Sequence, residues 1–401
     1  MSPHSAETRR AIAFLNWAHA IDHYVLLIFS TVVISLLVVY SRSYSELIAL
    51  STPCFVAFGV FSLPAGWLAD RWSRRNMMTL FYAGCGLSLV LAAFAPNLYV
   101  LATALFLLGV FASIYHPVGM AMLIEASQAR GRTLAFNGVC GNLGAALAAG
   151  ITGLLVDWFG WQAAFLVPAA LCLVTAPLFY WNVPDDRQHA AQRESKPGVR
   201  LTPAMAATMF GCFILIALTA GLIFNAVTVA LPKIVEERVG QDMSIASVGR
   251  LATAVFICGA LAQLAVGRLV ERIPPHLLLV VIVVIGLVGT LWAATASGFA
   301  MLVALALVMV SIYGQVTVND MVMARYTADA WRGRVYAVRY FLLFLSAGAA
   351  VAMIAHFHQQ GGFERLLLVT AAMTAVFLVA AVGVATIASL APARAAPQPA
   401  E

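Results

Sequence analysis

The sequence predicts an all-α membrane protein with twelve transmembrane helices in two pseudo-symmetric six-helix bundles. Three observations predict this fold. The composition is 62% hydrophobic and only 10% charged, apolar segments recur at the roughly 20 residues needed to cross a bilayer, and short motifs repeat about two hundred residues apart. A soluble chain of this length could not bury so much apolar side chain. We therefore expect the lipid bilayer to surround it.

Proline, glycine and charged residues divide the apolar sequence into twelve candidate spans. The first span is too long for a removable signal peptide and lacks a small-residue cleavage site, so we expect it to remain as a helix. Pro232 is expected to end the seventh span, because proline interrupts helical hydrogen bonding. The spans cover residues 11–39, 46–69, 77–95, 98–125, 133–156, 161–182, 204–231, 245–270, 277–296, 299–325, 333–356 and 364–388.

Three pairs of motifs relate the first six spans to the last six. All three pairs have nearly the same offset, which indicates a duplicated helical bundle, and such duplications in membranes are typical of transporters. The pairs are GWLADRWSRR from Gly66 with GRLVERIPP from Gly267, ARGRTLAF from Ala129 with WRGRVYAV from Trp331, and FGWQAAFLV from Phe159 with GGFERLLLV from Gly361.

The distribution of lysine and arginine predicts that both termini are cytoplasmic. This orientation places most of these residues inside, whereas the outer segments hold only Arg42, Lys233, Arg238 and Arg365. The net charge of +6 is thus a signal of topology and does not indicate nucleic-acid binding. We expect an integral protein of the bacterial inner membrane.

Polarity divides the chain into four parts. Residues 1–182 and 204–388 form the two bundles, 183–203 form a polar cytoplasmic linker, and 389–401 form a Pro/Ala-rich tail that we expect to be disordered. The six cysteines lie inside apolar spans, which favours small core residues over disulfides or metal ligands. A nucleotide-binding GxxxxGK[ST] motif is absent from the sequence, so ATP is not the expected driver, and we expect no cofactor.

These features together resemble the major facilitator superfamily over essentially the whole chain. AHAIDHY in the first span, IYHPVG in the fourth and RGRTLAFNGVCGNLGAAL leading into the fifth resemble its fosmidomycin-resistance-like exporter branch. Many drug–proton antiporters of the superfamily carry an arginine four residues before a glycine in span 4; here Leu105 precedes Gly109, so that proton step does not transfer. The loop signature after span 2 is matched by Gly66, Leu68, Ala69, Asp70, Arg71, Arg74 and Arg75, with Ser73 replacing its second glycine.

Asp22 lies near the middle of the first span, where an ionised carboxylate costs roughly 2.5–3.5 kcal/mol on insertion scales. His19 and His23 share its helical face, because i, i+3 and i+4 positions are neighbours. Three interpretations remain open. The group binds a proton, since histidine titrates near neutral pH; it makes a structural polar contact with another helix; or it binds a divalent metal with His116 as a further ligand. We adopt proton coupling and expect no metal.

Polar residues in other spans are candidate substrate contacts. Tyr115 and His116 precede Pro117, which is expected to kink the fourth span and expose polar groups. The alternative for His116 is a satisfied bond between helices. The remaining candidates are Asn225 in the seventh span and Gln315 and Asn319 on one face of the tenth.

Asp320 and Arg339 lie at similar distances on either side of the turn near Asp329, and we predict a buried ion pair between them. The pair would act either as a static element of the fold or as a switch coupled to substrate or protons.

The loop signature predicts a cytoplasmic gate. The resemblance implies that Asp70 contacts the start of span 11, near residues 331–333, where a helix N-terminus favours a negative charge. The arginines would pair with carboxylates such as Glu125 or Asp329 across the interface between the halves. Alternatively, these arginines serve topology alone. The gate residues are Gly66, Asp70, Arg71, Arg74 and Arg75.

The predicted function is transport of a small organic solute by alternating access, driven by protons. Export of a drug or toxic metabolite is the preferred direction, which the branch resemblance favours. The main alternative is proton-coupled uptake of a nutrient such as an organic anion, and a less favoured one is a non-transporting membrane sensor. The protein is not expected to be an enzyme. Neither the identity of the substrate nor the oligomeric state follows from the sequence.

Overall fold

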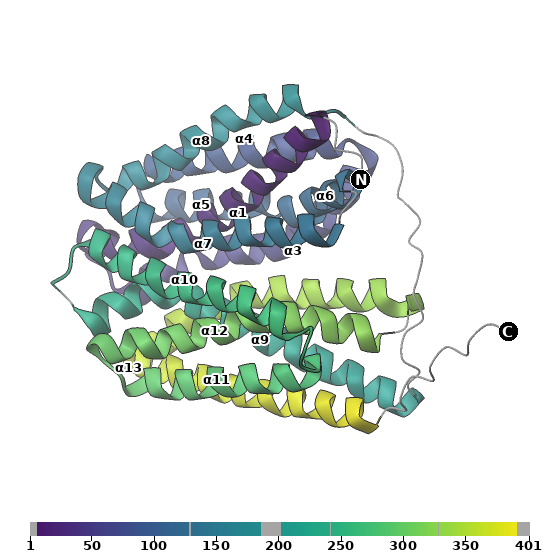
Figure 1. The fold of residues 1–401 in the computed structure, drawn as a ribbon. Coiled ribbons are helices and arrows are strands. Elements are labelled where there is room, and N and C mark those ends of the chain that lie inside the picture. Colours follow the sequence, from purple (N-terminus) through teal and green to yellow (C-terminus); the bar gives the residue numbers. More distant parts are fainter. Residues whose placement is uncertain (1–5, 128–129, 186–201, 241, 328, 391–401) are drawn as a thin grey trace.

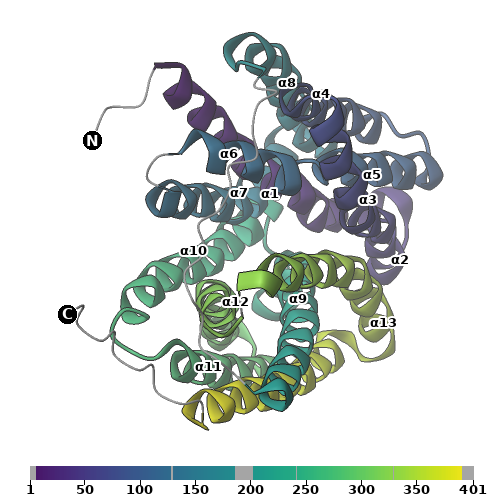
Figure 2. The same cartoon turned by 90° about the vertical axis from the view of Figure 1, so that its right-hand side faces the viewer.

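The computed structural model describes residues 6–127, 130–185, 202–240, 242–327 and 329–390. Every regular element in these residues is helical, and the helices gather in two halves (Figure 1). Viewed along the helices, α1–α8 lie together in one half and α9–α13 in the other (Figure 2). The predicted all-α fold of two helical bundles is therefore confirmed. Most of the predicted linker and tail lies outside the described residues.

The N-terminal half contains the first six expected spans, and two of them are interrupted. The second begins as a short helix that Ser43 and Glu46 start with a capping box. The fourth changes to a π-helical turn around Pro117. The elements are α1 (Ala6–Tyr40), α2 (Tyr44–Ala49), α3 (Thr52–Arg71), α4 (Arg74–Ala93), α5 (Leu98–Ala112), η1 (Tyr115–Gly119), α6 (Met120–Ala126), α7 (Arg130–Phe159) and α8 (Trp161–Asn182).

The C-terminal half contains the other six spans in five elements. The last element is 62 residues long and leaves helical geometry at Gly361 and Gly362. Gly362 has a φ of +63°, which favours glycine, so this break separates the last two expected spans. Among the described residues, eleven segments are long and apolar enough to cross a membrane, and the last one contains the break. The elements are α9 (Pro203–Val239), α10 (Ile245–Leu269), α11 (Pro275–Thr295), α12 (Gly298–Tyr326) and α13 (Asp329–Leu390).

The prediction that Pro232 ends the seventh span is wrong. Pro232 lies inside α9, which continues to Val239. A membrane helix tolerates such a proline when neighbouring groups satisfy the backbone carbonyl that it leaves unpaired. The extra turns carry Lys233 and Glu237 to the end of the bundle that is predicted to lie outside.

Glycines set the closest approaches between helices in the N-terminal half. A Cβ atom at Gly144 on α7 would overlap the carbonyl of Ala20 on α1, and one at Gly109 on α5 would overlap the carbonyl of Cys54 on α3. Small residues at such crossings let backbones pack closely in membranes. The contact between α1 and α7 places the polar middle of α1 beside Asn137.

The two halves meet through equivalent helices. α7 packs against α10, and α3 packs against the first part of α13. Gly249 on α10 faces the carbonyl of Ala149 on α7, and Gly348 on α13 faces Val56 on α3. Because these helices are the second and fifth spans of their halves, the interface follows the same duplication that the sequence motifs indicate.

Candidate proton and substrate site

His19 and His23 form the centre of a polar cluster on α1. The Nδ1 atom of His19 lies 2.8 Å from the backbone oxygen of Asn137, and its Nε2 atom lies 3.1 Å from Nε2 of His23. A carbonyl oxygen can only accept a hydrogen bond, so Nδ1 of His19 carries a proton. In the neutral ring, Nε2 then presents its lone pair to His23.

Asp22 and His116 form the second part of the cluster. Oδ2 of Asp22 lies 3.5 Å from Nε2 of His116, an ion-pair distance that is longer than a good hydrogen bond. The Asp22 side chain has no exposed surface, whereas 22% of the His116 side chain is accessible. Both carboxyl oxygens of Asp22 are buried without a hydrogen-bond partner. His116 therefore stands between a fully buried carboxyl group and the accessible surface.

The π-helical turn η1 brings Tyr115 and His116 to α1. Proline has no N–H group and its ring collides with the preceding helical turn, and the wider turn accommodates Pro117. The Tyr115 ring stacks on His19 with the ring centres 4.8 Å apart, and its hydroxyl donates to Oδ1 of Asn137 at 3.1 Å. Tyr115 is completely buried in this arrangement.

Asn137 joins the parts of the cluster, although it was not among the predicted site residues. Besides its bonds to His19 and Tyr115, its side chain donates to Oδ1 of Asn16 at 3.0 Å. The residue is completely buried on α7. An isolated amide within an apolar span was the available signal, because buried amides need partners.

Gly141 provides a test of how tightly the cluster is packed. A Cβ atom at this position would lie 2.5 Å from Nε2 of His19, so Gly141→Ala is expected to displace the ring. We expect a loss of proton-driven transport and a destabilisation of about 1–3 kcal/mol from overpacking. Gly138→Ala, one helical turn earlier, is the matched control because its Cβ would meet no atom within 4 Å. Transport assays and thermal unfolding of both variants would check this, and equal behaviour of the two would contradict it.

The candidate substrate contacts of the C-terminal half are bonded within that half. Asn319 donates to Oε1 of Gln315, whose own amide donates to the Ile312 carbonyl at 3.2 Å. Asn225 donates to the Gly221 carbonyl at 2.8 Å. The hydrogen bonds described for these side chains do not connect them to His116.

A chain of amides that was not predicted crosses between the halves. Asn142 on α7 donates to Oε1 of Gln263 on α10, and Gln263 donates to Oγ1 of Thr317 on α12 at 3.4 Å. Single amides in apolar spans were again the only signal. The chain links the N-terminal half to the helix that carries Gln315 and Asn319.

Asp320 on α12 and Arg339 on α13 form an ion pair. The Arg339 side chain is 10% exposed and that of Asp320 is 41% exposed. The pair joins two helices of the same half. The prediction of this ion pair is confirmed, but the prediction that it is buried is wrong for Asp320, whose side chain is exposed.

The loop arginines make contacts within the N-terminal half. Arg74 pairs with Asp70 at 3.0 Å and also with Glu125 on α6, while Arg75 lies 3.7 Å from Asp185. The expectation that Glu125 is reached across the interface between the halves is wrong, because α6 ends beside the turn between α3 and α4. The predicted partners of this loop at Asp329 and at residues 331–333 have side chains outside the described set.

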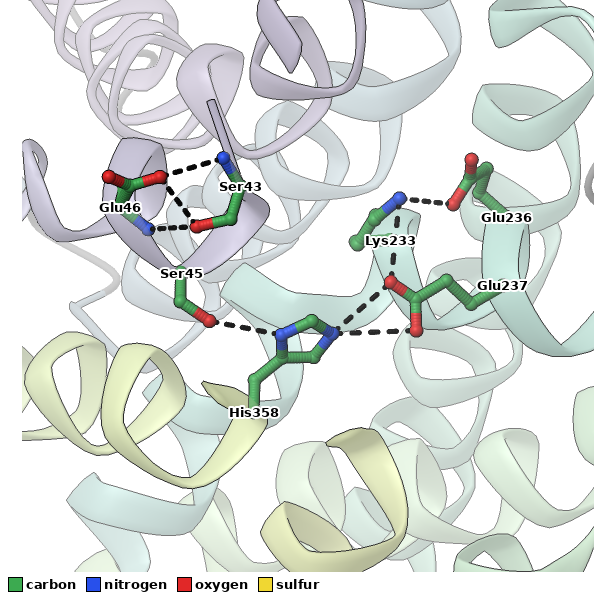
Figure 3. A network of polar contacts seen from close by, with 7 residues as sticks. All are labelled: Ser43, Ser45, Glu46, Lys233, Glu236, Glu237 and His358. Atoms are coloured by element: carbon green, nitrogen blue, oxygen red, sulfur yellow. Dashed lines mark hydrogen bonds and ion pairs between the residues drawn. The ribbon is translucent and has the colours of Figure 1, made fainter. Parts of the chain in front are cut away.

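A second polar network connects the halves at the end predicted to be outside (Figure 3). His358 on α13 lies 3.1 Å from Oγ of Ser45 on α2 and 3.2 Å from Oε1 of Glu237 on α9. Nζ of Lys233 lies 2.6 Å from Oε2 of Glu236 and 3.4 Å from Oε1 of Glu237. We call Ser45, Lys233, Glu236, Glu237 and His358 the outer network.

Comparison with known proteins identifies the family. A family profile described as Major Facilitator Superfamily matches residues 12–351. The chain belongs to the Major Facilitator Superfamily. It is therefore a member of a family of integral membrane transporters and not of an enzyme family, which leaves the sensor hypothesis without support.

Curated relatives in the superfamily match parts of the chain. A gallate transporter of Pseudomonas putida is 29% identical over 155 residues, covering 38% of this chain and 34% of that protein. The multidrug efflux pump LfrA of Mycolicibacterium smegmatis is 34% identical over 125 residues, covering 30% of this chain and 25% of the pump. The chain thus matches about a third or less of the length of these relatives.

A solved structure shows the same fold over nearly the whole length. It is a bacterial homologue of the human lysosomal transporter Spinster, in an inward-facing and unoccupied conformation. The TM-score is 0.78 at 12% identity, covering 98% of this chain and 100% of the homologue. At this identity the likeness concerns the fold alone.

Proposed function

We propose that this superfamily member is a proton-coupled exporter of a small organic solute, a drug or toxic metabolite. The observation that carries the coupling is the placement of Asp22, fully buried and 3.5 Å from His116. An ionised carboxylate without a partner is costly in such surroundings. The pair therefore holds a proton, either on Asp22 or on His116, and a transporter that takes up this proton on one side of the membrane and releases it on the other carries protons.

His116 connects this carboxyl group with the transport pathway. It is partly accessible, whereas His19 and His23 extend the cluster along α1 by a nitrogen contact of 3.1 Å. We assign proton coupling to Asp22, His19 and His23. A solute would contact His116 from one half and Asn225, Gln315 and Asn319 from the other, whereas the completely buried Tyr115 would hold the His19 ring in place.

The transport cycle would rock residues 1–182 against 204–388, with the linker and both termini in the cytoplasm of a bacterial cell. The cross-half hydrogen bonds between described residues run from Asn142–Gln263 in the middle to the outer network. These contacts hold the halves together on the outer side, and they would break when the protein opens outward. Asp70 and the neighbouring loop arginines would then gate the cytoplasmic side.

Uptake of an organic anion is the second candidate, because the relatives include a gallate transporter as well as a drug pump. An anion could compete with Asp320 for Arg339 and open their ion pair. The fosmidomycin-resistance-like branch, which the motifs of α1 and η1 resemble, favours export.

Proton movement in liposomes tests the proposal and separates the two candidates. The purified protein would be reconstituted with a pH dye in the lumen, with the voltage clamped by potassium and valinomycin. A cationic drug such as ethidium, or gallate, would then be added outside. An exporter exchanges solute for protons, so solute entry should make the lumen more alkaline, whereas symport should acidify it. This sign does not depend on the orientation of the protein.

Empty liposomes and liposomes treated with a protonophore are the controls. Solute flux without any change in lumenal pH would refute proton coupling, and acidification would replace export by symport as the function.

A further inference from the structure

We propose that His19, His23 and His116 bind one divalent transition-metal ion of the zinc class. One ring nitrogen from each residue lies within 4.8 Å of the others. The expected consequence, inhibition of transport, rests on the proposed proton-coupled function because the ion would occupy the proton site. The binding itself does not rest on that function.

The spacing of the nitrogens fits zinc. Ligands about 2.0–2.1 Å from a tetrahedral zinc ion lie about 3.4 Å from one another. Nε2 of His19 and Nε2 of His23 are 3.1 Å apart, so two of the three ligands already have nearly this separation. Two histidines at i and i+4 on one helix are a recurrent arrangement of zinc ligands.

The surroundings orient the His19 ring for metal binding. Metal-binding histidines usually donate their other N–H group to a carbonyl or carboxylate oxygen, which directs the free nitrogen to the metal. His19 donates from Nδ1 to the carbonyl of Asn137 at 2.8 Å. Stacking on Tyr115 holds the ring in this orientation, with the ring centres 4.8 Å apart.

Asp22 supplies an independent argument. It is completely buried beside His116, and neither of its carboxyl oxygens has a hydrogen-bond partner. A dication bound by the three imidazoles would pair with the negative charge of the Asp22 carboxylate. The carboxylate would in turn neutralise part of the charge of the metal ion. Imidazole ligands select zinc, cobalt, nickel or copper over magnesium and calcium, which prefer oxygen.

Binding would be measured on purified protein in detergent after removal of metals. We expect equilibrium dialysis to find one Zn²⁺ per chain, and Co²⁺ to give the visible absorption bands of a tetrahedral nitrogen site that Zn²⁺ then abolishes. His23→Asn should weaken Co²⁺ binding at least about tenfold. The control is His276→Asn, whose ring lies on α11 beside Tyr326 and should leave binding unchanged.

Wild-type protein that binds no ion would overturn the proposal, as would equal binding by wild type and His23→Asn. If that variant does not fold, the Co²⁺ spectrum of the wild type decides. Zn²⁺ should also block flux in the liposome assay. Metal binding without proton-coupled solute flux would refute the proposed function and retain the metal site. Proton-coupled solute flux without metal binding would refute the metal site and retain the proposed function.

Discussion

Asp22→Asn is expected to reduce proton-driven transport to the level of empty liposomes while the protein stays folded. The asparagine amide has nearly the shape of the carboxyl group but cannot take up or release a proton in the working pH range. Because Asp22 is completely buried, replacing its carboxyl group by an amide removes no contact with solvent. Folding should therefore change little, and the coupling should be lost.

Two measurements separate coupling from folding and binding. Thermal unfolding and size-exclusion chromatography should resemble wild type, and exchange of labelled solute across the membrane without a proton gradient should persist. Asp242→Asn is the matched control, since Asp242 lies on the exposed turn before α10. This variant should transport normally. Unimpaired gradient-driven flux in Asp22→Asn would remove Asp22 from the mechanism.

Contacts that depend on a single helix or a single turn could be predicted from the sequence. Helical periodicity places His19, Asp22 and His23 on one face of the first span. Counting residues from the turn near Asp329 places Asp320 and Arg339 at a similar depth in the membrane. The structure contains the His19–His23 contact and the Asp320–Arg339 ion pair. Both results use only the fixed rise and rotation of a helix.

Contacts that depend on how helices cross could not be predicted. The partner of His19 is a backbone carbonyl on α7, and it is reached because Gly144 lets α1 and α7 approach closely. The amides of Asn142 and Gln263 meet for a similar reason, at the interface between halves. A sequence without relatives gives no information on the rotation of one helix against another, so Asn137 and Gln263 were not selected.

The outer network was missed for a different reason. Ending the seventh span at Pro232 placed Lys233 and Glu237 in a loop, where charged residues are ordinary. Within the continuous helix α9, Lys233 instead pairs with Glu237, and Glu237 contacts His358 on α13. The error in one helix boundary thus concealed the partner of His358, the residue that also contacts Ser45 of the N-terminal half.

A disulfide across the interface of α7 and α10 is expected to stop transport. The Cβ position at Gly150 lies 3.6 Å from Cβ of Thr253, within the range of about 3.5–4.5 Å typical of disulfides. Both residues lie toward the outer ends of their helices. In the double variant Gly150→Cys/Thr253→Cys, oxidation would hold the outer sides of the halves together, so the protein could no longer open outward.

Reduction of the same sample is the internal control, since it should restore flux without any change in sequence. The single variant Thr253→Cys under the same oxidant controls for the six native cysteines, all of which are free. Mass spectrometry would establish that the disulfide forms. Full transport by a protein shown to be crosslinked would mean that α7 and α10 do not separate during the cycle, and rocking of one half against the other would have to be abandoned.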